Sequence, residues 1–123
     1  MKGKYAKFLA QIVLTAADTG PSIFVGRGAH LIISREKVLA VRIIASMEFR
    51  VRRVATIMKA GYKETERKLM EMDKEQRNFF KKFYGKTGSS PYEFDIVINR
   101  DFLEDKHVIA KIIVEAYQGK FPK

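Results

Sequence analysis

A short apolar stretch that breaks into Gly26-Arg27-Gly28 is the most informative chemical pattern in the sequence. Phe24 and Val25 precede it, as in a buried strand that leads into a loop. In open α/β sheets ligands bind beyond the carboxyl ends of such strands, and glycines let the backbone come close to a ligand. An arginine between two glycines can form paired hydrogen bonds with a phosphate group or a base edge. The pattern predicts that Gly26, Arg27 and Gly28 bind an anionic substrate; the alternative is a tight turn with a surface arginine.

A second group of arginines follows Ser46, which is a good first residue for a helix. Arg50 and Arg53 are three residues apart, so they share one face of that helix. With Arg42 and Arg52 close by in the sequence, they form a cationic cluster that could hold phosphate. The alternative is a helix face whose charges are simply solvated.

Asp73 and Arg77 are four residues apart within a later helical segment. As a surface ion pair they would contribute roughly 0.3 to 0.5 kcal/mol. In the functional interpretation, the aspartate orients the arginine against a phosphoryl group in transfer, because positioned cations are central to that reaction. Arg50, Arg53, Asp73 and Arg77 are therefore the candidate catalytic residues.

The elements that must position these side chains alternate between helices and short apolar strands. Gly20 and Pro21 end the first helix, and the nearly continuous apolar run of residues 38–45 is typical of an interior strand of a parallel sheet. This order predicts an α/β fold with a parallel sheet. The expected helices are 6–17, a turn at 29–33, 46–60, one from Thr65 to 84 or 85, and 103–118; the expected strands are 22–25, 38–45 and 94–99.

Composition limits the classes of function. The chain has 123 residues, 46% of them hydrophobic and 31% charged, which fits one soluble domain spanning residues 1–123. The formal net charge of +10 favours anionic partners such as nucleotides. There is no cysteine, no apolar run long enough to cross a membrane, and no spacing of metal ligands around His30 or His107. We expect a cytoplasmic protein with no metal ligands of its own.

Four segments in series resemble the cytidylate kinase-like family of P-loop nucleotide kinases, and the resemblance runs from about Ile12 to Tyr117. They are residues 23–29 (Ile-Phe-Val-Gly-Arg-Gly-Ala), 44–53 (Ile-Ala-Ser-Met-Glu-Phe-Arg-Val-Arg-Arg), 73–77 (Asp-Lys-Glu-Gln-Arg) and 94–99 (Phe-Asp-Ile-Val-Ile-Asn). The resemblance implies a three-layer fold with a parallel sheet between helices. It also implies transfer of a phosphoryl group from ATP, with Mg²⁺, to a pyrimidine nucleoside monophosphate.

The same resemblance implies roles for individual residues. Arg27 would contact the acceptor nucleotide. Arg50 and Arg53 would begin a mobile, helical lid at residues 47–92, and Asp73 and Arg77 would lie within it. Arginines of such a lid would hold the phosphates and exclude water.

One part of the family pattern is missing from this sequence. Family members begin with a strand and a glycine-rich loop whose backbone N–H groups and lysine hold the donor phosphates. In the family that strand lies inside the sheet, between the strands that match residues 22–25 and 38–45. We therefore expect an incomplete kinase fold with open strand edges, and little or no phosphoryl transfer by this chain alone.

Two other functions fit the same sequence. The net charge and the mixture of lysines with Phe79, Phe80, Phe83 and Tyr84 could serve a nucleic-acid-binding module, although such aromatic spacing is more typical of a helix anchored to a core. An open sheet edge could instead recruit a partner, which includes a second copy of the chain.

Overall fold

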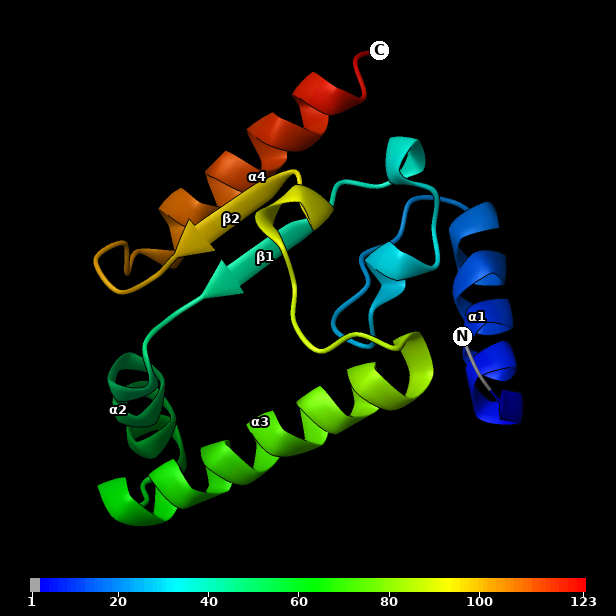
Figure 1. Cartoon of the computed structure of the whole chain (residues 1–123). Coiled ribbons are helices and arrows are strands. Elements are labelled where there is room, and N and C mark those ends of the chain that lie inside the picture. The colour runs from blue at the N-terminus through cyan, green and yellow to red at the C-terminus, as the bar shows by residue number, and fades with distance from the viewer. Residues whose placement is uncertain (1–2) are drawn as a thin grey trace.

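The computed structural model describes residues 3–123 as a mixed α/β arrangement of helices around a small sheet (Figure 1). Three short 3₁₀ turns connect the longer elements, at Ala29–Leu31, Arg35–Lys37 and Pro91–Glu93. In chain order the main elements are α1 (Gly3–Asp18), β1 (Val41–Ile44), α2 (Met47–Met58), α3 (Tyr62–Tyr84), β2 (Ile96–Asn99) and α4 (Lys106–Lys120).

Helix α1 forms where the apolar residues recur at helical spacing, as predicted. One side of it packs on a small core in which Val13 meets Ala29 and Ile33. The apolar face is only partly covered, because Phe8 is 61% exposed and Ile12 is 52% exposed. Helix α1 thus has an apolar face, which the described chain covers only in part.

The sheet is parallel, as the sequence predicts, and has two strands. Val41 of β1 lies opposite Ile96 of β2, and the register continues to Ile44 opposite Asn99. The predicted interior position of β1 is wrong for residues 3–123, since β1 pairs with β2 alone and leaves its other edge open. The structure confirms a mixed α/β fold with a parallel sheet. The three-layer arrangement stays a prediction.

The predicted strand at residues 22–25 does not form. These residues are irregular, and within residues 3–123 no backbone–backbone hydrogen bond involves Ile23, Phe24 or Val25. A strand exists only when a neighbour satisfies its N–H and C=O groups. Phe24 packs on the core beside α1, whereas Ile23 and Val25 are 93% and 91% exposed.

The predicted N-cap of α2 forms, whereas the predicted N-cap of α3 does not. The Ser46 hydroxyl accepts a hydrogen bond from the Phe49 N–H at 3.1 Å, so Ser46 is the N-cap of α2, as predicted. Gly61 begins α3, and Thr65 lies in its first turns with its hydroxyl donating to the Gly61 carbonyl at 2.8 Å. The prediction that Thr65 caps this helix is therefore wrong: a threonine inside a helix bonds back to the preceding turn instead.

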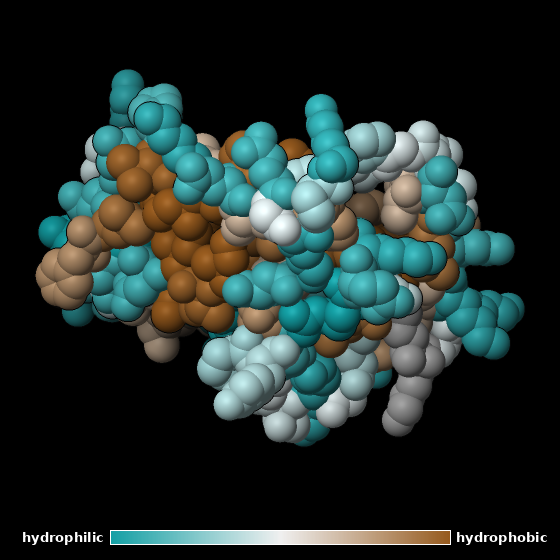
Figure 2. Space-filling model, turned by 90° about the horizontal axis from the view of Figure 1, so that it is seen from above, coloured by the Kyte–Doolittle hydropathy of each residue, from teal (hydrophilic) through white to brown (hydrophobic). Residues whose placement is uncertain are grey.

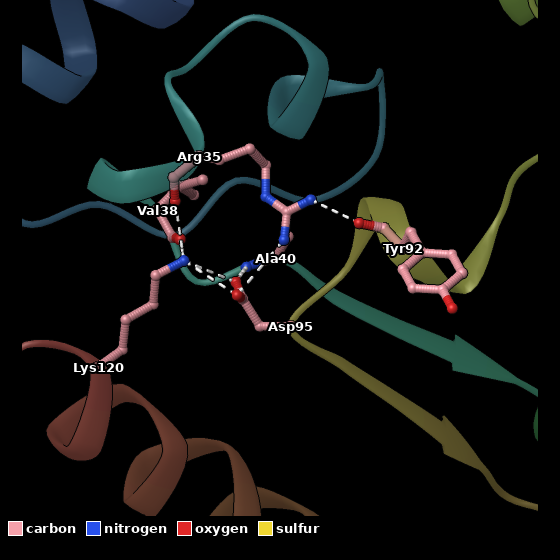
Figure 3. A network of polar contacts seen from close by, with 6 residues as sticks. All are labelled: Arg35, Val38, Ala40, Tyr92, Asp95 and Lys120. Carbon is pink, nitrogen blue, oxygen red and sulfur yellow. Dashed lines mark hydrogen bonds and ion pairs between the residues drawn. The ribbon is translucent and has the colours of Figure 1, made fainter.

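A polar clasp ties α4 to the amino-terminal end of the sheet (Figure 3). Asp95, just before β2, accepts the Ala40 N–H at 2.7 Å and the Lys120 ammonium at 2.9 and 3.0 Å. Lys120 also donates to the Arg35 and Val38 carbonyls, at 2.8 and 2.6 Å. Burial alone would raise the pKa of Asp95, but these hydrogen bonds hold it below its usual value. The clasp joins three segments that lie far apart in the sequence.

The molecule exposes an unusually large surface for its size. Its accessible area is 9508 Å², about 40% more than the roughly 6,800 Å² expected for a folded monomer of 14.2 kDa. Seen from above, one face carries a broad apolar area toward the left (Figure 2). Among residues 3–123 no helix is both long enough and apolar enough to span a bilayer.

Candidate functional site

An open hollow of about 2560 Å³ lies between the sheet, α3 and the loop that follows α1. It is lined by Gly26 and Gly28 from that loop, by Arg50 of α2, and by Asp73 and Arg77 of α3. Residues up to about fifty positions apart in the sequence thus face one space. The structure brings together five of the seven predicted site residues.

The loop Gly26-Arg27-Gly28 has a backbone that glycine makes possible. All three residues have positive φ angles, of 77°, 59° and 72°, in the left-handed region that side chains disfavour. The Tyr84 hydroxyl, at the end of α3, donates to the Arg27 carbonyl at 2.6 Å. The loop is therefore attached to the carboxyl end of α3.

The Arg27 side chain turns away from the hollow. Its guanidinium lies over the Phe79 ring at 5.1 Å from the ring centre, and it is not among the residues that line the space. Phe79 belongs to an aromatic cluster with Tyr5 and Phe83, whose rings lie 4.8 to 6.5 Å apart. The aromatic residues of α3 therefore anchor this helix to α1, as their spacing indicates.

Gly28→Ala is expected to lower the free energy of unfolding by roughly 2 kcal/mol, because it combines backbone strain with a steric clash. A Cβ on Gly28 would lie 2.8 Å from the Tyr84 ring. Gly26→Ala is the matched control, since its φ is similar but no atom lies within 4 Å of its Cβ position. Urea unfolding should show about half the loss for the control. Equal losses would mean that the contact with Tyr84 costs nothing.

Arg50 and Asp73 form a two-pronged ion pair between α2 and α3. The two terminal guanidinium nitrogens of Arg50, Nη1 and Nη2, donate to the two carboxylate oxygens of Asp73 at 2.9 and 2.6 Å. This hydrogen bonding lowers the pKa of Asp73 and raises that of Arg50. Asp73 was predicted to orient Arg77; in the structure Arg50 is its hydrogen-bonded partner. Arg77 acts on Asp73 only through its charge.

The lining of the hollow is strongly positive. Seven basic residues and three acidic ones line it, and two of the three carboxylates, Asp73 and Glu93, are already paired with Arg50 and Lys86. Lys81 and Lys86 line the hollow although they were not predicted site residues, and Tyr84 holds the Gly26-Arg27-Gly28 loop without lining the hollow itself. The sequence did offer a signal for these two residues, because Lys81 and Lys86 lie on either side of Gly85, the glycine that ends α3.

Arg53 lies elsewhere. It lines a separate, shallow hollow of about 360 Å³ with Arg52 of α2 and Glu104 from the loop before α4. Residues three apart on a helix are still offset by about 60° around its axis, and the boundary between the two hollows runs between Arg50 and Arg53. Its predicted catalytic role stays a prediction.

Metal ligands are not gathered in this structure. Residues 3–123 contain no group of three or more His, Asp or Glu side chains placed to hold a metal ion. His30 stacks on the Phe94 ring at 4.8 Å and lies 3.9 Å from Glu93. These contacts make His30 part of the wall of the hollow.

A model of a known protein family matches most of the chain. The chain matches the model of the cytidylate kinase-like family over residues 1–101, more than half of its length. The chain belongs to the cytidylate kinase-like family. The match includes every predicted site residue, from Gly26 to Arg77, and ends just after β2. No curated protein matches the chain. Kinase-like character is therefore shown at the level of the family.

Three carboxylates give this cytidylate kinase-like fold a defined response to acid. Hydrogen bonds from Arg50 and Lys86 lower the pKa values of Asp73 and Glu93, and the clasp does the same for Asp95. Their folded pKa values lie below the unfolded values of about 3.9 to 4.3, so only the unfolded chain takes up protons there. The stability they provide is complete above about pH 5 and is lost as the pH falls through the folded values. Urea unfolding at pH 6, 5, 4 and 3 should show this.

His30 adds a separate step at higher pH. Burial lowers its pKa, so between the unfolded value of about 6.5 and its folded value only the unfolded chain binds a proton. Stability should therefore begin to fall just below pH 6.5. His30→Gln should remove this step and keep the acid loss below pH 4. If the loss of stability just below pH 6.5 persists in His30→Gln, a group other than His30 causes it.

Proposed function

We propose that the hollow binds the phosphates of a nucleotide and that the protein takes part in phosphoryl transfer from ATP to a pyrimidine nucleoside monophosphate. One observation carries this proposal: Arg50 and Arg77, on different helices, line the same positive hollow as the glycines of the Gly26-Arg27-Gly28 loop. Phosphoryl transfer depends on positioned cations far more than on covalent chemistry by the protein. Membership of the cytidylate kinase-like family supports the same reaction.

Each residue has a proposed part in that reaction. Gly26 and Gly28 let the backbone approach the acceptor nucleotide, and Arg27 reaches it by leaving the Phe79 ring. Arg77 is exposed and without an ion pair among residues 3–123, so its five N–H donors are available to phosphate oxygens. Asp73 holds the Arg50 fork in one orientation. Residues 47–92, which contain α2 and α3, form the lid.

ATP and Mg²⁺ are proposed because the chain belongs to a kinase-like family. Mg²⁺ is usually held by substrate phosphates, water and one or two carboxylates. The described residues provide no carboxylate cluster for it, so the nucleotide phosphates would be its main ligands. Bound there, Mg²⁺ would neutralise phosphate charge. The residues named above bind and orient the nucleotide.

The donor phosphates need a loop that residues 3–123 do not contain, since none of their strands leads into a glycine-rich turn carrying a lysine. We therefore propose that residues 1–123 by themselves bind an acceptor nucleotide with little phosphoryl transfer. Isothermal titration with CMP and UMP should show binding that weakens with salt. Incubation with ATP, Mg²⁺ and CMP should yield no more CDP than a protein-free control. Rapid turnover would contradict the second half of the proposal alone.

Arg77→Ala tests the site directly. Loss of one charge-assisted contact should weaken CMP binding roughly tenfold. Arg67→Ala is the matched control, because Arg67 is an exposed arginine of the same helix that does not line the hollow. Unchanged CMP affinity in Arg77→Ala, or equal losses in both variants, would overturn the assignment.

A nucleic-acid-binding function is the second candidate, and the net charge of +10 is the observation that favours it. Such binding would be tight at low salt and would fall steeply as salt rises. Titration of a mixed-sequence oligonucleotide against the same concentrations of CMP separates the two. Weak oligonucleotide binding beside saturable CMP binding would support the nucleotide site.

A further inference from the structure

Tyr84, the last residue of α3, holds the Gly26-Arg27-Gly28 loop by two kinds of contact. Its hydroxyl donates to the Arg27 carbonyl at 2.6 Å. Its ring lies so close to Gly28 that a Cβ there would be 2.8 Å from the ring. Burial raises the pKa of the Tyr84 hydroxyl, so the hydroxyl remains a donor at neutral pH. Neither contact takes part in the proposed binding of phosphates.

The backbone of Arg27 needs such support because it is strained. Its φ of 59° lies in the left-handed region that residues with a Cβ disfavour. Residues in such conformations persist where the surrounding structure fixes them, and they are frequent at ligand-binding sites. The Arg27 side chain is held differently, because its guanidinium stacks over the Phe79 ring at 5.1 Å. The guanidinium can therefore leave that ring while a directed hydrogen bond keeps the carbonyl in place.

Helix α3 joins this loop to the cations of the hollow. Arg77 and Tyr84 are seven residues apart, so they lie about two turns apart on one side of the helix. Asp73 lies one turn further along the same side and holds Arg50 by the two-pronged ion pair. Figure 1 shows α3 running as one helix from α2 toward α1. The distance from the loop to Arg77 is therefore set by this helix and by the Tyr84 contacts.

We propose that Tyr84 is a positioning residue for the acceptor nucleotide. Its hydrogen bond keeps the Arg27 carbonyl in place, so the guanidinium turns from the Phe79 ring to the nucleoside end of the acceptor at a fixed distance from Arg77. Arg77 binds the phosphate group at the other end. Recognition then depends on both ends of a nucleoside monophosphate, and a bare phosphate gains nothing from Tyr84. This inference rests on the proposed binding of a nucleotide.

Tyr84→Phe tests the hydrogen bond and keeps the ring against Gly28. Isothermal titration with the full chain should show roughly three- to tenfold weaker affinity for CMP. The affinity for inorganic phosphate, measured from the NMR shifts of backbone amides, should change less than about twofold, because phosphate needs only the arginines on the helices. Tyr92→Phe is the matched control, since the Tyr92 side chain is 92% exposed, and it should leave the CMP affinity unchanged.

A double variant separates positioning from a general loosening of the site. In an Arg27→Ala background, Tyr84→Phe should weaken CMP binding less than about twofold further, because its effect acts through Arg27. An equal fold-loss in both backgrounds overturns the proposal. Unchanged CMP affinity in Tyr84→Phe also overturns it, and so does an equal loss for inorganic phosphate. If the wild-type chain does not bind CMP, the proposed function itself fails, and this inference fails with it.

The wild-type chain provides a test that needs no variant. On addition of CMP, the NMR signals of the Phe79 ring should shift, because the Arg27 guanidinium leaves that ring. The signals of the Tyr84 ring should stay where they are. If Tyr84→Phe does not fold by circular dichroism, this measurement decides. Shifts at Tyr84 as large as those at Phe79 would show that the loop detaches from α3 when CMP binds, and they would overturn the proposal.

Discussion

Asp95→Ala is expected to lower the free energy of unfolding by roughly 2 to 3 kcal/mol, since it removes several charge-assisted hydrogen bonds at once. The carboxylate accepts the Ala40 N–H at 2.7 Å and the Lys120 ammonium at 2.9 Å. Ala40 is 2% exposed, so water cannot readily replace the lost acceptor. Arg35, at 3.4 Å, also loses its ion pair. Urea unfolding at pH 7 measures the change.

Two variants separate charge from hydrogen bonding in the clasp. Asp95→Asn keeps an oxygen for the Ala40 N–H and should lose roughly half as much stability. Glu75→Ala removes an exposed carboxylate of α3 and should change the free energy of unfolding by less than about 0.5 kcal/mol. A loss for Asp95→Ala as small as that of Glu75→Ala would show that α4 is held by other contacts.

Arg50→Ala should have the largest effect on nucleotide binding, roughly 10- to 100-fold weaker affinity for CMP. The variant removes a guanidinium that lines the hollow and leaves Asp73 without its two-pronged partner. The free carboxylate then repels phosphate, so two unfavourable changes add. Isothermal titration with the full chain at low salt measures the affinity.

The control for this prediction lies on the same helix. Arg52→Ala makes the same change in net charge, but Arg52 lines the separate shallow hollow, so CMP affinity should change less than about twofold. Arg50→Lys keeps the charge and loses the fork geometry, and should fall between the two. Equal CMP affinities for Arg50→Ala and Arg52→Ala would show that only the overall charge of the protein matters. Arg50 would then not be a residue of the binding site.

The local signals of the chain predicted most of the secondary structure. Ser46 begins α2 because its hydroxyl is a ready acceptor for the helix N–H groups, and Gly85 ends α3 with a φ of 67°. The parallel pairing of β1 with β2 followed from apolar strands separated by helices. Thr65 was misassigned because a hydroxyl can bond back within a helix as well as cap one.

Long-range arrangement limited the prediction of the site. The spacing of Asp73 and Arg77 favoured a pair within one helix, but the packing of α2 on α3 gave Asp73 a two-pronged partner in Arg50. Tyr84 was missed because its contact with Arg27 joins residues 57 positions apart. Spacing grouped Arg53 with Arg50, but which hollow each side chain lines depends on the segments packed around α2, and Arg53 lies beside Arg52 and Glu104.

The sequence by itself determined the helices, the parallel strands, the positive charge and the order of motifs of the cytidylate kinase-like family, because these depend on neighbouring residues and their spacing. Only the tertiary structure decided which arginines face the hollow, which carboxylate holds Arg50, and whether residues 22–25 become a strand. Those outcomes depend on partners brought from distant parts of the chain. A strand in particular exists only where another strand satisfies its backbone.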